Sequence, residues 1–219
     1  GVLLHVLKAG QSDVLIGSSD AGGAYLMLDG DSNGDGSGAD YAYIAHDTGG
    51  DLIIAGDNPS GDAEVILKAG NNSEKLRIDS SGRLLIGTAA SRQNVVECQL
   101  QIEGTTQPGS SFSLTRNSND VAPPNLLFAK SRGTSTGSNT IVQSGDWLAY
   151  IAALGADGTD TDTESSSIRM MVDGTPGSND MPGRIEFWTT PDGSATPSER
   201  MRIDSSGHLL INTSTASSY

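Results

Sequence analysis

Clustered oxygen-bearing side chains form the most specific chemical pattern in the sequence. Within one twelve-residue window they recur at the spacing of a calcium loop, at Asp29, Asp31, Asn33, Asp35 and Asp40. Asp replaces the terminal Glu of such loops, and no flanking helices are expected, so the pattern predicts a weak loop site for Ca²⁺. The alternative is an acidic, Gly-rich turn that is only solvated. Asp157, Asp160 and Asp162 form a looser counterpart.

Aromatic side chains are the second candidate set. Trp147 and Tyr150 lie in one apolar run, and Trp188 lies in another. Sugar rings stack on exposed Trp and Tyr faces, so these three residues are candidate ligand-binding residues for a glycan. Packing in the core of a module is the alternative. The Gly-, Ser-, Thr- and Asp-rich loops 131–140 and 155–167 are the expected variable recognition surface.

Nucleophile chemistry has weak support in this sequence. Residues 133–137 (GTSTG) match the nucleophile-elbow pattern of hydrolases, but that motif needs a strand before it and a helix after it, and neither is expected here. His5, His46 and His208 lie near predicted strands or turns. A carboxylate pair for glycoside hydrolysis can converge from anywhere in a chain. No catalytic residue is predicted.

Short strands are the elements that must position these residues. Leu76 and Ile78 alternate with charged residues, then residues 80–82 (SSG) supply a turn, and a second apolar strand follows. This pattern predicts a β-hairpin with charges on one face and apolar side chains on the other. The same alternation predicts strands at 112–114 and 185–187. No stretch has convincing helical spacing.

The predicted hairpin occurs twice. Residues 74–88 match residues 199–213 at 11 of 15 positions, with an offset of 199 − 74 = 125. Weaker similarities extend the repeat backwards, between residues 42–45 and 149–152. We therefore predict two modules, 1–92 and 93–219, each ending in this hairpin.

Charge and composition exclude several partner classes. The chain has 27 acidic and 13 basic residues, a net charge of −14, so nucleic acid and anionic membrane surfaces are repelled. The longest apolar run, residues 147–154, is too short to span a bilayer, so no membrane insertion is expected. A single cysteine, Cys98, excludes an intrachain disulfide.

The small number of large apolar residues, including 3 Phe and 2 Trp, favours a core that is shared between copies of the chain.

Residues 198–207 (SERMRIDSSG) resemble the repeated signature of phage tail fibres, especially those of cyanophages and other marine phages. Residues 183–191 and 28–38 are similar to further stretches of such fibres. The resemblance implies a homotrimer, located in the virion tail outside the cell, that joins other tail or baseplate proteins and binds host surface glycan or lipopolysaccharide. It also implies that a self-cleaving chaperone domain follows in related fibres.

The expected fold is all-β: an elongated homotrimeric fibre of repeated β-sandwich or β-prism-like modules with terminal β-hairpins. The predicted function is attachment to the host cell without enzyme activity, and the one cofactor considered is Ca²⁺. Two alternatives stay open. One is a calcium-dependent extracellular adhesin or carbohydrate-binding module, and the other is a polysaccharide depolymerase.

Overall fold

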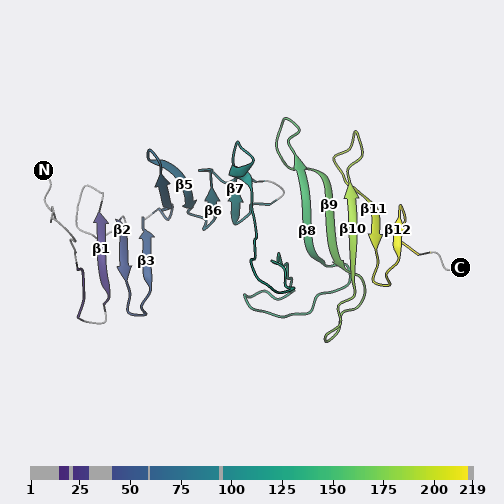
Figure 1. Cartoon of the computed structure of the whole chain (residues 1–219), viewed down its shortest axis with the longest axis horizontal. Coiled ribbons are helices and arrows are strands. Elements are labelled where there is room, and N and C mark those ends of the chain that lie inside the picture. Colours follow the sequence, from purple (N-terminus) through teal and green to yellow (C-terminus); the bar gives the residue numbers. More distant parts are fainter. Residues whose placement is uncertain (1–14, 20–21, 30–40, 59, 94–95, 217–219) are drawn as a thin grey trace. The chain divides into compact units, whose positions relative to one another are not determined.

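The computed structural model describes residues 15–19, 22–29, 41–58, 60–93 and 96–216, and in this part the chain is all-β, as predicted (Figure 1). A single 3-10 turn, η1, accompanies the strands. The elements are β1 (Ala24–Asp29), β2 (Tyr41–His46), β3 (Leu52–Gly56), β4 (Val65–Ala69), β5 (Ser73–Ile78), β6 (Leu84–Ile86), β7 (Leu100–Ile102), η1 (Pro108–Ser110), β8 (Trp147–Gly155), β9 (Thr163–Val172), β10 (Gly183–Thr189), β11 (Ser198–Ile203) and β12 (Leu209–Ile211). Over the same residues, no helix is long and apolar enough to cross a membrane.

The chain divides into two compact units, Gly1–Arg92 with Glu97–Ser111, and Gln93–Val96 with Phe112–Tyr219. The first unit contains a sheet of order β1-β2-β3 and a sheet of order β4-β5-β6-β7, and the second contains a sheet of order β12-β11-β10-β9-β8. Strand β7 lies beyond the predicted module boundary but pairs in parallel with β6. The module boundaries, 1–92 and 93–219, stay a prediction.

The hairpin predicted from the sequence is present in both units. In the first, Leu76 pairs with Ile86 and Ile78 with Leu84. In the second, Met201 pairs with Ile211 and Ile203 with Leu209, which is the same register shifted by 125 residues. Closely similar local sequence therefore produces the same strand pairing in two different sheets.

An aspartate closes the turn of each hairpin. Asp79 Oδ1 accepts hydrogen bonds from the backbone N–H groups of Ser81 (3.0 Å) and Arg83 (2.9 Å). Asp204 Oδ1 does the same for residues 206 and 208, at 2.9 Å each. Gly82 and Gly207 follow with φ of 78° and 81°, a left-handed conformation that Gly adopts without steric cost. The SSG turn is thus explained by both its aspartate and its glycine.

The structural repeat is longer than the repeat in the sequence. Strand β10 pairs with β11 as β4 pairs with β5: Phe187 faces Met201, Leu67 faces Leu76, and each strand has a β-bulge directly after this pair. The loop between the strands has three residues (70–72) in the first unit and eight (190–197) in the second. We call β4–β6 the first meander and β10–β12 the second meander. A loop longer by 8 − 3 = 5 residues leaves the strand register unchanged.

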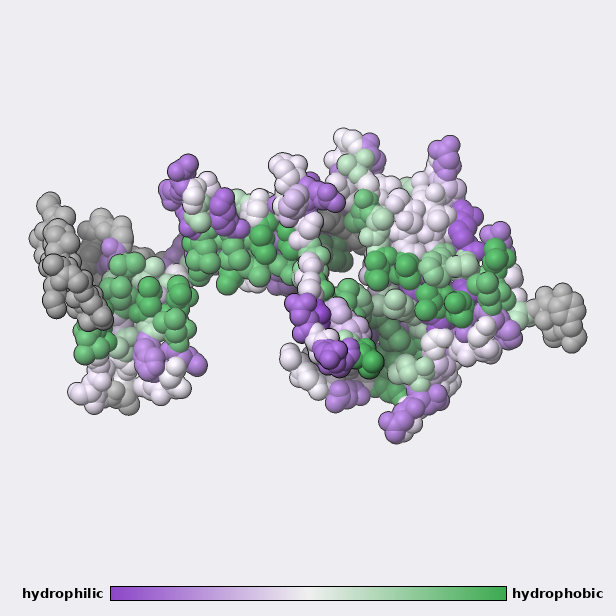
Figure 2. All heavy atoms as spheres, in the orientation of Figure 1, coloured by the Kyte–Doolittle hydropathy of each residue, from purple (hydrophilic) through white to green (hydrophobic). Residues whose placement is uncertain are grey.

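One face of each meander presents six apolar side chains. Because side chains alternate along a strand, equivalent positions in the two copies lie on this face. They are Val65, Leu67, Leu76, Ile78, Leu84 and Ile86 in the first meander, and Ile185, Phe187, Met201, Ile203, Leu209 and Ile211 in the second. None of the twelve side chains is buried, and Ile211 is 63% exposed. Figure 2 shows apolar surface, in green, open over the strands of the four-stranded sheet.

The apolar face of the second meander continues onto β9 and β8. Ile185 pairs with Met170, Phe187 pairs with Ile168, and Ile168 pairs with Ile151. We call this side of the five-stranded sheet the apolar face and the opposite side the polar face. Few apolar side chains are buried in the described part of the chain: Ala45, Leu85, Val142, Ala149, Met171, Val172 and Leu210.

One predicted strand is absent. Residues 112–114 are assigned no secondary structure, and no strand of the described chain pairs with them. The weaker similarity between residues 42–45 and 149–152 also has different surroundings in the two units. Strand β2 lies between β1 and β3, whereas β8 is the edge of its sheet. A side-chain pattern predicts extended backbone but does not identify the strand that pairs with it.

Candidate functional site

A row of polar and aromatic side chains crosses the polar face of the five-stranded sheet. The register places Tyr150 opposite Arg169, Arg169 opposite Glu186, and Glu186 opposite Arg202. These four residues come from β8, β9, β10 and β11, so each strand of this part of the sheet contributes one member. Strand pairing alone therefore brings together residues from position 150 to position 202.

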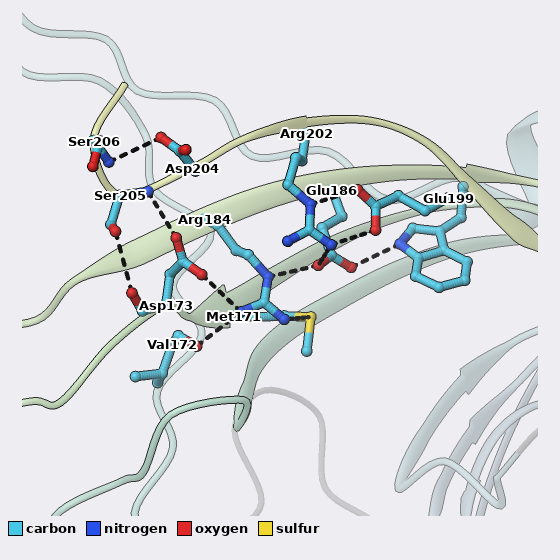
Figure 3. Close-up of polar contacts among 11 residues, drawn as sticks. Met171, Val172, Asp173, Arg184, Glu186, Glu199, Arg202, Asp204, Ser205 and Ser206 are labelled. Atoms are coloured by element: carbon cyan, nitrogen blue, oxygen red, sulfur yellow. Dashed lines mark hydrogen bonds and ion pairs between the residues drawn. The ribbon is translucent and has the colours of Figure 1, made fainter. Parts of the chain in front are cut away.

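Glu186 is the centre of this row and is only 2% exposed. Arg184 Nε donates a 2.6 Å hydrogen bond to Glu186 Oε1, and Arg202 Nη2 lies 3.1 Å from the same oxygen. Trp188 Nε1 donates a 2.8 Å bond to Oε2, and these contacts are seen in Figure 3. A buried carboxylate is tolerated when it is paired and hydrogen-bonded, and both oxygens of Glu186 have partners.

Arg202 extends the network to Glu199. Arg202 Nε donates a 2.5 Å hydrogen bond to Glu199 Oε1, and Nη2 donates to Oε2. The hydrogen bonds and the negative charge of Glu199 raise the pKa of Arg202 above its ordinary value, against the effect of burial. The first meander has the same pair, because Arg77 donates two 2.6 Å bonds to Glu74. This bidentate pair is part of the repeated element.

The three predicted aromatic residues gather around Arg169. The guanidinium carbon of Arg169 lies 3.8 Å from the ring centroid of Trp188, 4.6 Å from that of Trp147 and 5.8 Å from that of Tyr150. The Trp147 and Tyr150 centroids are 5.5 Å apart. Cations bind aromatic faces through the ring quadrupole, so the arginine holds the three rings together. We call Trp147, Tyr150, Arg169 and Trp188 the aromatic cluster.

Glu164 completes the surroundings of Arg169. Arg169 Nη2 donates a 3.2 Å hydrogen bond to Glu164 Oε1, and Tyr150 Oη donates to Oε2. Burial and this bond to the carboxylate raise the pKa of Tyr150 to about 12. Burial alone would raise the pKa of Glu164, but hydrogen bonds from Ser167, Tyr150 and Arg169 outweigh it and lower that pKa. The cluster is a charge-compensated unit.

The arrangement limits what the aromatic cluster can bind. The faces of Trp188 and Trp147 that point toward Arg169 are occupied by its guanidinium, and Trp147 remains 43% exposed. A sugar can therefore stack only on a ring surface that faces away from the arginine. The three aromatic residues are together, as a shared site requires, and their role in ligand binding stays a prediction.

A second connection joins two loops beside the network. Asp173 Oδ1 accepts a 3.0 Å bond from Arg184 Nη1, and Oδ2 accepts a 2.8 Å bond from the backbone N–H of Ser205. Ser205 Oγ donates to the Asp173 carbonyl at 3.1 Å, as Figure 3 shows. Asp173 therefore ties the β9–β10 loop to the turn of the second hairpin.

Sequence reasoning missed the charged members of the site: Arg169, Arg184, Glu186 and Arg202. A signal existed for Arg202, because Arg77 occupies its place in the repeat. Glu186 replaces Ile66 of the first meander at the equivalent position. A carboxylate at a position that is apolar in the other meander indicates that a charged partner, here Arg184 and Arg202, lies beside it.

Most of the predicted calcium loop lies outside the described residues. Asp29 is the last residue of β1 and pairs with Tyr41, whereas Asp31, Asn33, Asp35 and Asp40 are not described. In the looser counterpart, Asp157 Oδ1 accepts the backbone N–H of Thr159 at 2.8 Å, and Asp160 Oδ1 accepts that of Asp162 at 3.0 Å. No group of three or more acidic, histidine or cysteine side chains suited to a metal ion occurs among the described residues. Calcium binding stays a prediction.

The GTSTG segment lacks the surroundings of a nucleophile elbow. Residues 133–137 lie in bends and a turn, with no strand before them and no helix after them in the described chain. His208 Nδ1 lies 2.9 Å from Asp204 Oδ2 in the second hairpin turn, and His46 ends β2. His5 is outside the described residues.

A hollow with a mixed apolar and polar wall, here called the loop hollow, lies beside this segment. It has a volume of about 480 Å³, and Ile141, Val142 and Met181 form part of its wall. Its lining includes Lys130, Ser131, Asn139, Thr140 and Ser178. Part of the predicted recognition loop 131–140 thus forms the wall of a depression.

Comparison with solved structures identifies the fold. The carboxy-terminal domain of the bacteriophage T5 L-shaped tail fibre matches 97% of this chain and 91% of its own, with a TM-score of 0.52 and 16% identity. The same domain with its intra-molecular chaperone domain matches 99% of this chain, with a TM-score of 0.51 and 16% identity. This chain covers 64% of that longer protein. No protein-family model and no curated protein matches the sequence. The tail-fibre resemblance of the sequence is therefore confirmed at the level of the fold.

Proposed function

We propose that this chain is a segment of a phage tail fibre that assembles as a homotrimer in the virion tail and attaches the virion to a glycan of the host surface. The observation that carries this proposal is the uncovered apolar face of the two meanders. It is joined by the likeness of the fold to a tail-fibre domain. The function is structural and adhesive and needs no catalytic residue.

The apolar face requires a partner. Burying a large apolar side chain contributes about 1.5–3 kcal/mol, and both meanders leave six such side chains half-buried or exposed. Contiguous exposed apolar surface of this kind marks an interaction site. No second layer covers this surface among the residues that the structure describes.

A second copy of the chain is the partner that fits. The six apolar positions recur in the same register in both meanders, so a partner that covers both must itself repeat. A symmetric homo-oligomer meets this requirement because each copy presents the same face. The polar face needs no partner of this kind, because Glu186 and Arg202 already compensate each other.

Host attachment is assigned to the loops of the second unit. Hydroxyl and amide groups bind sugar hydroxyls, and the loop hollow offers Ser131, Asn139, Thr140 and Ser178 beside its apolar side chains. Lys130 in the same wall suits an acidic sugar or the phosphate of a lipopolysaccharide. Three copies on one trimer increase the avidity of a weak site.

Two measurements test this function. Sedimentation equilibrium should give three times the monomer mass of 22.6 kDa, and a monomer at all concentrations would overturn the assembly. Binding to host cells should be inhibited by purified envelope glycan and reduced severalfold by Asn139→Ala. A trimer that does not bind the glycan would refute the proposed attachment but not the proposed assembly. Shortening of the glycan chains by the protein would refute the proposal that it has no enzyme activity.

A further inference from the structure

We propose that residues 112–130, here called the arm, pack on the apolar face of the five-stranded sheet in a second copy of this chain. The inference rests on the proposed self-assembly and goes beyond it, because it assigns which segment covers which surface. It also explains why a segment with a strand pattern has no strand partner.

The backbone of the arm has no ladder partner. The sequence predicts a strand at 112–114, but the structure assigns the arm neither helix nor strand and has a bend at 119–121. Within the described chain, no backbone-to-backbone hydrogen bond joins residues 112–130 to another residue. Backbone groups without a backbone partner are available for β-type pairing with another chain.

The side chains of the arm are equally uncovered. Phe112, Leu114, Leu126, Leu127 and Phe128 are all exposed, and Leu127 is 84% exposed. Three consecutive apolar residues, 126–128, are exposed together. No surface of the described residues covers them.

The bend of the arm is held in shape. Arg116 donates two 2.6 Å hydrogen bonds to the Asp120 carboxylate and another to the Ala122 carbonyl. The backbone N–H of Ala122 donates to Asp120 Oδ1 at 2.9 Å. A segment that is already shaped loses less conformational entropy when it docks than a random one.

The apolar face offers a place for the arm. A hollow of about 370 Å³ lies on the five-stranded sheet, with Ile151, Ala153, Ile168, Phe187 and Thr189 in its lining. Its surface is predominantly apolar, as residues 126–128 require. We assign Leu127 and Phe128 of one copy to this hollow in another.

The distribution of charge favours binding of the arm to a second copy of the chain. Within 112–130 the charged residues are Arg116, Lys130 and Asp120, which give 2 − 1 = +1, while the remaining chain has −14 − 1 = −15. A weakly basic arm is attracted to an acidic partner, and another copy of this chain is such a partner.

Cross-linking between two tagged copies tests the assignment. Both copies carry Cys98→Ser, so that the single native cysteine is removed. One copy carries Ala129→Cys beside Phe128, and the other carries Ala153→Cys at the hollow. Both are exposed alanines, so neither substitution disturbs packing. After co-expression and mild oxidation, we expect a disulfide between the two tags in a large share of mixed assemblies. Ser206→Cys in the hairpin turn, paired with Ala129→Cys, is the control and should give at least tenfold less.

The outcomes separate this inference from the proposed function. Monomeric protein by sedimentation would overturn both. Assembled protein without the 129–153 cross-link, or with equal cross-linking to residue 206, would overturn the arm alone. As a second test, replacing residues 126–128 with Ser should weaken assembly at least tenfold, and unchanged assembly would also contradict the arm.

Discussion

Arg202 contacts Glu186 across neighbouring strands, with 3.1 Å between Nη2 and Oε1, where the first meander has Arg77 opposite Ile66. The second meander thus gained a buried carboxylate at a position that is apolar in its counterpart. Arg184 and Trp188 supply the remaining partners of Glu186. The stability of the polar face therefore depends on this carboxylate.

Replacing Glu186 with Gln should destabilise the second unit by about 3 kcal/mol, because Arg184 and Arg202 would keep their charges without the buried carboxylate. Urea unfolding followed by tryptophan fluorescence measures this loss. Asp120→Asn is the control, since Asp120 pairs with Arg116 at an exposed site of the same unit and should change its stability little. Equal effects of the two substitutions would show that the network is not structural.

Ile203→Asp should prevent assembly while leaving the strands intact. Ile203 is exposed on the apolar face of the isolated chain, so Asp is tolerated there until a second copy has to cover it. Sedimentation velocity should show a shift from trimer to monomer. Ser206→Asp, in the adjacent turn, should stay trimeric. A trimeric Ile203→Asp variant would place the interface elsewhere.

Acid should release the contact between Arg132 and Asp146. Hydrogen bonds from the Arg132 guanidinium and from the Gln143 N–H lower the pKa of Asp146 from 3.8 to about 2. Because the folded pKa lies below the unfolded one, the stabilisation is complete above about pH 4 and is lost as pH falls toward 2. The stability difference between wild type and Asp146→Asn should therefore shrink in this window. Arg132→Gln should show the same profile, and a difference that stays constant would contradict the assignment.

Gly207→Ala should cost about 1 kcal/mol, because Ala at a φ of 81° is strained. No atom lies within 4 Å of the added Cβ, so the effect is one of backbone conformation alone. Gly155→Ala is the matched control: its surroundings are equally open and its φ is not in the left-handed region. Thermal unfolding of both variants checks the difference, and equal melting temperatures would exclude the strain.

Calcium should raise the melting temperature if residues 29–40 form the predicted loop site. Chelator should reverse the rise, and Asp31→Asn should abolish most of it, because ligand binding stabilises the folded state. Asp157→Asn serves as the control at the looser acidic loop. An unchanged melting temperature with and without chelator would refute the predicted calcium site.

Local sequence was sufficient for the hairpins and insufficient for the site. Residues 74–88 contain the alternation, the aspartate and the glycine that determine their own pairing, so both copies could be predicted. The row of Tyr150, Arg169, Glu186 and Arg202 depends on pairing among four strands and on the bulge after Phe187. Neither is encoded by the spacing of single residues. The aromatic residues were predicted, but the arginine that organises them was not, because an isolated Arg in a strand has no distinguishing pattern.

The apolar runs predicted the strands but not what covers them. They predict strands correctly at β4–β6 and β10–β12, yet apolar alternation alone indicates neither a core within one chain nor one shared among several. Residues 112–114 carry the same pattern as 185–187 but pair with no strand of the described residues. The pattern within one chain does not specify which surface covers such a segment.

The two meanders have connecting loops of different length, which shows that the meander tolerates insertions at this position. Three residues connect β4 to β5 and eight connect β10 to β11, with an unchanged register and bulge. The length of this connection is therefore independent of the fold, and the tip at residues 191–196 is exposed. A foreign peptide grafted there would be displayed once per copy without disturbing the strands, which makes this tip a position for inserting binding peptides or affinity tags.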